Sequence, residues 1–427
     1  MQYSTFAAID IGSYDVILEI FEISKKQGIR SVDKICHRME LGKDTYTLGK
    51  IRPEMEEELC RVLADFVRIM EGYRVDDYRA AASSAISEAS NSLYVLGKIH
   101  QLTGLSVTVL SNSEQRFLSY KALAAMEDNF NKIIEKGTAI LDLDGGSFQI
   151  SLFDKDALVT TQNIRMGSLR IRERLAGIQS ETEHYEEMVE ELIWNEVSSF
   201  KKMYLKDRKI ENIMLIGDVF TDSVYQNIEE KTTKIISREN FNTWYEKIIR
   251  QSPMELAVKL GIPLENASLM YPSAVIYKCL IDMMGAEHIW IPGVHMTRGI
   301  AYEYAEQMKL LKGGHNFEND ILMAAKNIGK RYAVNRPHVQ NLEMTALAMF
   351  DATKKMHGMK ERERLLLQMA VMLHDVGKYI SFNNVADSSY NIIMSNEIIG
   401  LSHIEREMVA LIARYNTVTL PSYDELV

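Results

Sequence analysis

The feature that most constrains the fold is a pattern that occurs twice in the chain. An apolar, strand-like run ends in an aspartate, small residues follow, and a second apolar run begins at once; the copies read FAAIDIGSYDVILEIFEI and GTAILDLDGGSFQISLFD. Each copy predicts a β-hairpin closed by a glycine turn. Asp10 and Asp142 lie 142 − 10 = 132 residues apart, which is the spacing expected if one α/β unit is repeated.

Helical and strand-like patterns alternate between the two hairpins, which favours a mostly parallel sheet flanked by helices. After about residue 312 the strand signals thin out and apolar residues recur at helical spacing. We therefore predict α/β domains over residues 1–125 and 126–311, followed by an all-helical domain over 312–427. The expected elements between the hairpins are a helix over 53–73, a strand over 77–83, a helix from about 84, a strand over 105–110 and a helix from 113.

Composition limits the partners and the compartment. The 427 residues are 46% apolar and 25% charged, as in soluble globular proteins. Lys+Arg number 49 and Asp+Glu 59, so the net charge of −10 argues against a nucleic-acid-binding protein. A local basic cleft for a small polyanion is compatible with this charge. Three distant cysteines, Cys36, Cys60 and Cys279, form neither a disulfide framework nor a zinc pattern and fit a reducing compartment.

Neither a membrane span nor an export signal is expected. No stretch approaches the roughly 18 uncharged apolar residues that a span needs. The first residues, MQYSTFAAIDIGS, lack the basic start of a signal peptide and lead directly into a strand-like run. We therefore expect a cytoplasmic protein that does not contact a membrane.

The two aspartate–glycine turns have the chemistry of phosphate sites. An aspartate at the end of a strand, followed by small residues, lies beside exposed backbone N–H groups. The amides can hold phosphate oxygens, and the carboxylate can hold a hydrated magnesium ion or orient a water. A single turn of this kind fits an ordinary hairpin equally well. Two copies that face each other would clamp a phosphate chain between them.

Five ordered motifs resemble the exopolyphosphatase / guanosine pentaphosphate phosphatase (Ppx/GppA) family, whose fold is shared by actin-like ATPases and sugar kinases. IDIGSYD and LDLDGGSFQI resemble the two phosphate turns of that family. AASSAISEASN, VLSNSEQRFLSYKAL and MGSLRIRERL resemble its ATSAVREAxN, LSGxEEARLxYxG and LGxVRLTE segments. The resemblance implies two actin-like (ribonuclease-H-like) domains and an appended helical domain of HD type.

The resemblance also implies an activity and a site. The family removes terminal phosphate from polyphosphate or guanosine penta- and tetraphosphates, using magnesium and a glutamate that activates water; the matching glutamate is Glu114. An acid at this position can also simply stabilise the first turn of a helix. The other implied site residues are Asp142 and Gln149 for catalysis, Asp10, Asp142 and Asp144 for Mg²⁺, and Gly12, Ser13, Tyr14, Gly145, Gly146 and Ser147 for phosphate.

The chain also departs from the family pattern. Ile17 and Ser87 replace two family arginines, and each charge-assisted contact to phosphate is worth about 1.5–3 kcal/mol. Asp15 and Asp144 add negative charge, and Gln149 replaces an acid. The cations that could compensate are Arg116, Lys121, Arg165 and Arg170. Alternatively, extra magnesium held by Asp10, Asp142 and Asp144 could offset the loss. The alternative function is therefore a catalytically degraded member that senses phosphate or nucleotide or binds a partner protein.

An ATPase is a third alternative, because the resemblance implies a fold shared with actin-like ATPases. The family carries a glycine pair near a third turn, where this chain has Gly217 and Asp218. That change argues against an adenosine pocket.

The helical region carries one more candidate site. His338 begins one helical stretch and His374-Asp375 ends another, which is the metal-ligand arrangement of HD phosphohydrolases. The HD pattern needs further ligands, yet the following segment, SFNNVADSSYNIIMSNEIIG, contains no histidine. We therefore favour a structural role for these residues, in a domain that builds the cleft or a homodimer contact.

Overall fold

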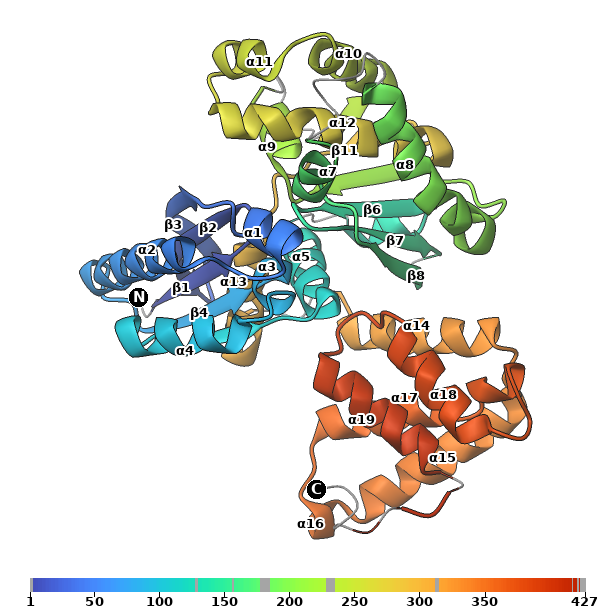
Figure 1. Cartoon of the computed structure of the whole chain (residues 1–427). Coiled ribbons are helices and arrows are strands. Elements are labelled where there is room, and N and C mark those ends of the chain that lie inside the picture. The colour runs from blue at the N-terminus through green and yellow to red at the C-terminus, as the bar shows by residue number, and fades with distance from the viewer. Residues whose placement is uncertain are drawn as a thin grey trace. The chain divides into compact units, whose positions relative to one another are not determined.

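The computed structural model describes residues 3–126, 130–155, 157–176, 185–227, 235–311, 315–416, 418–420 and 422. The chain divides into two compact units. The first comprises Met1–Asp156 and Gln162–His315, and the second comprises Ala157–Thr161 and Asn316–Val427 (Figure 1). Within the described residues, no helix is both long and apolar enough to cross a membrane.

The first sheet of unit one has the strand order β3-β2-β1-β4-β5. The repeated hairpin pattern forms its centre, where β1 pairs antiparallel with β2 as predicted, and β4 and β5 extend the sheet in parallel from β1. One face packs on α2 and α4 around a core that includes Ile9, Leu18, Leu63 and Ile99. The strands are β1 (Ser4–Ile11), β2 (Asp15–Ser24), β3 (Gly28–Arg38), β4 (Asp77–Ala82) and β5 (Val107–Val109).

The second sheet has the order β10-β11-β9-β6-β7-β8 and repeats the central hairpin in β6 and β7. Strand β9 pairs in parallel with β6, and β11 in parallel with β9. Both sheets are therefore mixed rather than mostly parallel, because each repeated hairpin contributes antiparallel pairs. The strands are β6 (Thr138–Leu143), β7 (Phe148–Asp154), β8 (Ala157–Ile164), β9 (Asn212–Ile216), β10 (Ile235–Ser237) and β11 (His288–Trp290).

The helices of unit one flank these sheets, and the elements predicted between the hairpins are all present. The first group is α1 (Leu41–Leu48), α2 (Pro53–Gly72), α3 (Ser84–Ser87), α4 (Ser92–Thr103), α5 (Asn112–Met126) and α6 (Phe130–Ile134). The second group is α7 (Ser168–Leu175), α8 (Tyr185–Phe200), the π-helix η1 (Lys201–Leu205), α9 (Val219–Asn227), α10 (Arg238–Ile249), α11 (Pro253–Leu260), α12 (Leu264–Met284) and α13 (Met296–Gln307).

Helix α13 returns to the first sheet after the chain has passed through the second. It packs against β1, β2 and α5. Ile300 and Ala301 of α13 share a buried cluster with Phe6, Phe21 and Leu118, so this face of the first sheet is covered by a segment almost 300 residues later in the chain. The pattern of strands and helices along the sequence did not predict this return.

The second unit is helical over its described C-terminal residues, as predicted. Its core contains Leu366, Met369 and Val409. The Asn327 amide donates to the backbone oxygen of Leu158 (2.7 Å), one of the β8 residues that belong to this unit. The helices are α14 (Phe317–Arg331), α15 (Arg336–Ala352), α16 (Lys354–His357), α17 (Glu361–Leu373), the 3₁₀-helix η2 (Val376–Tyr379), α18 (Val385–Ser395) and α19 (His403–Arg414).

Candidate active site

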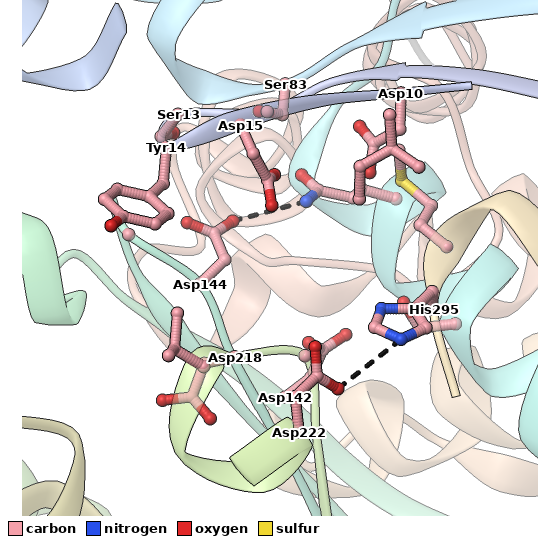
Figure 2. Close-up of a pocket in the computed structure, with 18 of the residues that line it drawn as sticks. Asp10, Ser13, Tyr14, Asp15, Ser83, Asp142, Asp144, Asp218, Asp222 and His295 are labelled. Atoms are coloured by element: carbon pink, nitrogen blue, oxygen red, sulfur yellow. Dashed lines mark hydrogen bonds and ion pairs between the residues drawn. The ribbon is translucent and has the colours of Figure 1, made fainter. Parts of the chain in front are cut away.

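A cavity of about 210 Å³ in unit one brings the two glycine turns together. Residues of the β1–β2 turn, the β6–β7 turn, the first turns of α5 and α9, and the segment before α13 line it (Figure 2). Of the predicted site residues, those that line the cavity are Asp10, Gly12, Ser13, Tyr14, Asp142, Asp144 and Gly145. The cavity residues that the sequence analysis did not assign include Asp15, Lys34, Gln115, Asp218 and Asp222.

The β1–β2 turn is closed by its own backbone. The Gly12 N–H donates to the Asp15 carbonyl (2.9 Å), and a side chain at position 12 would approach that oxygen to 2.9 Å. The Ser13 hydroxyl lies 2.7 Å from the Tyr46 hydroxyl and 3.1 Å from that of Ser84. Small residues are therefore required where the turn meets its neighbours.

The β6–β7 turn is held by Asp144 and by close packing. The Asp144 carboxylate accepts a hydrogen bond from the Gly146 N–H (2.6 Å). A Cβ atom on Gly146 would lie 2.1 Å from the Tyr46 hydroxyl and 2.6 Å from that of Ser84, so only glycine fits there. Gly146 and Ser147 do not line the cavity in the described structure, although both were predicted to bind phosphate.

Arg116 of α5 neutralises part of the negative charge in the second turn. Its guanidinium lies 3.0 Å from Asp142 Oδ1 and 3.3 Å from Asp144 Oδ2, and it donates to the Ser147 hydroxyl at 2.9 Å. The Arg116 side chain is only 2% exposed. Of the cations proposed to replace the missing arginines, Arg116 alone lines the cavity. Its charge is already shared between two carboxylates.

The other proposed replacement cations serve other contacts. Lys121 pairs with Glu303 (3.0 Å), and Arg165 is exposed. Arg170 donates to the Gly146 carbonyl (2.8 Å) and pairs with Glu88 of the first domain (3.0 Å). Arg170 therefore steadies the second turn from outside the cavity.

A third bend, between β9 and α9, completes the cavity wall. Gly217 has φ = 101°, and a Cβ atom there would lie 2.5 Å from Asp142 Oδ1, so the bend needs glycine on both counts. The next residue, Asp218, accepts hydrogen bonds from the Thr221 N–H (3.0 Å) and the Tyr277 hydroxyl (3.1 Å). Burial raises the pKa of Asp218 to about 6.

The cavity is strongly acidic. Six aspartates line it, at positions 10, 15, 142, 144, 218 and 222, against the cations Lys34 and Arg116 and the imidazole of His295. Burial raises the pKa of Asp10 well above its ordinary value, and repulsion from neighbouring aspartates adds to this. Burial also raises the pKa of Asp142, although Arg116 opposes the shift. A polyanion can enter such a site only together with cations.

Glu114 and Gln115 face different surroundings on the first turn of α5. Glu114 accepts from the Ser111 N–H (2.9 Å) while the Ser111 hydroxyl accepts from the Glu114 N–H (3.2 Å), which is a capping box. Gln115 lines the cavity and donates to Asp144 (3.2 Å), whereas Glu114 is not among the residues of the cavity wall. The catalytic role predicted for Glu114 thus remains a prediction, and its position indicates a helix cap.

Gln149 lies in β7, paired across the hairpin with Asp142. Its side chain is 1% exposed, and its Nε2 is buried without a hydrogen-bond partner among the described residues. Gln149 is absent from the described cavity wall, so its predicted role in orienting a water stays a prediction.

Two carboxylates have the donor chemistry that magnesium requires. Asp10 Oδ1 and Asp142 Oδ2 are buried and lack a hydrogen-bond partner among the described residues. Mg²⁺ prefers one or two carboxylates and completes its shell with water and substrate phosphates. Asp144 fits less well, because Gly146, Gln115 and Arg116 already donate to it. Asp10 and Asp142 therefore fit a magnesium ion.

Family comparisons agree with this architecture. A model of the Ppx/GppA phosphatase family matches residues 20–308, about two thirds of the chain, and a model of domain III of these phosphatases matches residues 322–424. The chain belongs to the Ppx/GppA phosphatase family. Membership of this family supports phosphatase chemistry.

Individual relatives are distant. A bifunctional 3-dehydroquinate synthase/phosphatase from Fusobacterium nucleatum is 21% identical over an alignment of 310 residues that covers 66% of this chain and 44% of that protein. The chain therefore matches less than half of this relative's length.

Two solved structures, described next, share their fold with this Ppx/GppA member. The Ppx/GppA member from Aquifex aeolicus has a TM-score of 0.59 at 17% identity, covering 72% of this chain and 99% of its own. An exopolyphosphatase from Cytophaga hutchinsonii has a TM-score of 0.63 at 17% identity, covering 72% and 100%. These likenesses confirm the predicted duplicated actin-like fold.

The three residues predicted for an HD-type site do gather in unit two of this Ppx/GppA member. One ligand atom each from His338, His374 and Asp375 lies within 4.8 Å of the others. His374 Nδ1 is 2.7 Å from the Val371 carbonyl, so Nε2 faces Asp375 at 3.4 Å. The Lys378 ammonium donates to the other carboxylate oxygen, Asp375 Oδ2, at 2.6 Å.

We expect this triad to hold less than a stoichiometric amount of metal. Lys378 already neutralises Asp375, and three ligands, one of them on the exposed His338, make a weak site. Elemental analysis of protein purified without chelator should find well below one iron, manganese or zinc per chain. EDTA should leave the unfolding temperature unchanged. Stoichiometric metal, lost in His374→Ala, would contradict the structural role.

Proposed function

We propose that this protein is a phosphoanhydride hydrolase that releases terminal phosphate from inorganic polyphosphate in a magnesium-dependent reaction. The observation that carries the proposal is the meeting of the two glycine turns, at Gly12 and Gly145, around one cavity. That cavity contains Asp10 and Asp142, each with a buried oxygen that has no hydrogen-bond partner in the part of the chain that the structure describes. Guanosine pentaphosphate is the alternative substrate, because its terminal phosphoanhydride has the same chemistry.

Residues of the cavity would bind the phosphates, bind magnesium and position one another. Backbone N–H groups of Ser13 and Gly145 would hold oxygens of the terminal phosphates. The Gly12 N–H closes its own turn on the Asp15 carbonyl, and the absence of a side chain at Gly12 would let the substrate approach the backbone. Asp10 and Asp142 would hold magnesium, which when bound neutralises phosphate charge. Arg116 would keep the Asp142 carboxylate in place. The glycine at position 217 keeps the third bend close enough to enclose the substrate.

One observation favours a second function, a sensor that binds polyphosphate or a phosphorylated nucleotide without hydrolysing it. The α5 side chains that line the cavity are those of Gln115, Arg116 and Ser119, and the Gln115 amide can orient a water but cannot accept its proton. The Arg116 guanidinium, in turn, already forms ion pairs with Asp142 and Asp144. A protein that binds without turnover would have both features.

Phosphate release from long-chain polyphosphate, measured with and without Mg²⁺, tests the proposal. A hydrolase should release phosphate continuously with Mg²⁺ and stop when EDTA is added. A sensor should release none, yet polyphosphate with Mg²⁺ should raise its unfolding temperature. Parallel assays with guanosine pentaphosphate identify the better substrate. Absence of both release and thermal protection with either compound would contradict both functions.

A further inference from the structure

Hydrolysis at this cavity needs a group that accepts a proton from water, and α5 does not present one. The Glu114 carboxylate caps its own helix, and the neighbouring side chain in the cavity wall is an amide, Gln115. General-base catalysis contributes about 10²–10⁴-fold to such reactions, so a hydrolase would gain much from a carboxylate elsewhere in the wall. This inference rests on the proposed hydrolase function.

Three of the six cavity aspartates are already engaged. Asp144 accepts hydrogen bonds from one backbone and two side-chain donors. Asp142 is paired with Arg116 at 3.0 Å. Asp218 is anchored by the Thr221 N–H and the Tyr277 hydroxyl. Each of these three carboxylates is held in place by its donors and therefore has fewer lone pairs left to accept a hydrogen bond from a water.

Two more aspartates are better suited to other roles. Asp222 lies at the rim with its side chain 42% exposed, 3.4 Å from His295 Nε2. Asp10 has a buried oxygen without a hydrogen-bond partner among the residues with a described structure, and it fits the magnesium ion. Asp15 is the sixth aspartate of the cavity wall.

Asp15 combines access to the cavity with weak anchoring. It begins β2, directly after the glycine turn, and its side chain points from that strand into the cavity (Figure 2). Among the described residues, the donor to its carboxylate is the Cys36 thiol, at 3.4 Å from Sγ to Oδ2, and a thiol is a weak donor. We infer that Asp15 is the general base that takes the proton of the attacking water.

The chemistry balances without any further reactant. As the water oxygen forms a bond to the terminal phosphorus, its proton moves to an Asp15 oxygen. The bridging P–O bond breaks, and its electron pair stays on the shortened polyphosphate. Asp15 then releases its proton to solvent. One water and one phosphoanhydride are consumed, and orthophosphate leaves.

The surroundings of Asp15 suit this role. Burial raises the pKa of the Asp15 carboxyl, and the nearby Asp222 adds to this, while Cys36, His295 and Lys34 oppose it. The side chain is therefore a stronger base than an exposed aspartate, yet cationic neighbours favour its ionised form.

Asp15→Asn tests the inference, because it keeps the shape of the side chain and removes its basicity. With long-chain polyphosphate and Mg²⁺, kcat should fall at least 100-fold. The KM for polyphosphate and the Mg²⁺ concentration for half-maximal rate should change less than threefold. Asp65→Asn, an exposed aspartate of α2, is the matched control and should retain the wild-type rate. The double variant Asp15→Asn/Gln115→Glu, which returns a carboxylate to the cavity from α5, should recover at least tenfold over Asp15→Asn.

Four results would contradict the role of Asp15 as the general base, and each points to a different explanation. A kcat within threefold of wild type removes Asp15 from the reaction, as does a gain in rate. A loss that high Mg²⁺ restores makes Asp15 a metal ligand instead. A large loss in Glu114→Gln with none in Asp15→Asn returns the base to Glu114. Wild-type protein that releases no phosphate from any substrate overturns the proposed function together with this inference.

Discussion

Arg116→Leu is expected to lower the free energy of unfolding by about 3–5 kcal/mol, the cost of removing one partner from a buried ion pair. The Arg116 side chain is 2% exposed and lies within 3.3 Å of oxygens of both Asp142 and Asp144. Leucine would leave these two carboxylates without their counter-charge and the Ser147 hydroxyl without its donor. The β6–β7 turn should therefore loosen, and phosphate release should fall with it.

Urea denaturation at pH 7.5 measures this change. Arg61→Leu is the matched control, because Arg61 is exposed on α2, and it should alter stability by less than about 0.5 kcal/mol. Arg116→Lys keeps a positive charge and should lie between Arg116→Leu and wild type, since an ammonium cannot reach three partners in the same fork geometry. A loss below about 1 kcal/mol in Arg116→Leu would mean that another cation neutralises the turn.

Asp218→Asn is expected to stabilise the protein at pH 8 by up to about 3 kcal/mol. Burial raises the pKa of Asp218 from 3.8 to about 6, and about 1.36 kcal/mol corresponds to each pH unit of that difference. Because the folded state binds this proton more tightly than the unfolded state, the contribution of Asp218 is favourable below pH 4 and is lost as the pH rises to about 6. Asparagine is neutral throughout and can still accept from Thr221 and Tyr277.

The pH dependence distinguishes this cause from a general packing effect. The gain of Asp218→Asn over wild type should be largest at pH 8 and disappear near pH 4, measured by urea denaturation at both values. Comparing variant with wild type cancels the titration of the other aspartates, including the nearby Asp222. Asp65→Asn should show no such trend. An equal gain at both pH values would indicate that ionisation of Asp218 is not the source.

The sequence predicts the parts of this site that depend on local pattern. The hairpins around Asp10 and Asp142 form as expected because an apolar run, a glycine turn and a second run determine a hairpin by themselves. Their meeting at one cavity follows from the repeat. The mixed character of the sheets follows from the same hairpins, although alternation of elements had favoured parallel pairing.

The parts of the site that depend on side-chain orientation and on tertiary packing could not be predicted from local sequence patterns. Adjacent residues on a helix point about 100° apart, so one turn can direct Gln115 into the cavity and Glu114 away from it. A local signal for this was present, since Ser111 followed three residues later by Glu114 is a capping-box sequence. Asp218 and His295 join the cavity through tertiary packing of the third bend and the segment before α13, which no local pattern encodes.

The return of α13 to the first sheet determines when that part of the molecule can finish folding. Phe6 and Phe21 are synthesised early, but their partners Ile300 and Ala301 follow some 280 residues later. At about 5–20 residues per second, ribosomes need roughly 14–56 s for that stretch. Until α13 is synthesised, this apolar face of the first sheet is exposed on the nascent chain. Chaperones can bind the exposed face during that time, and aggregation competes with its burial by α13.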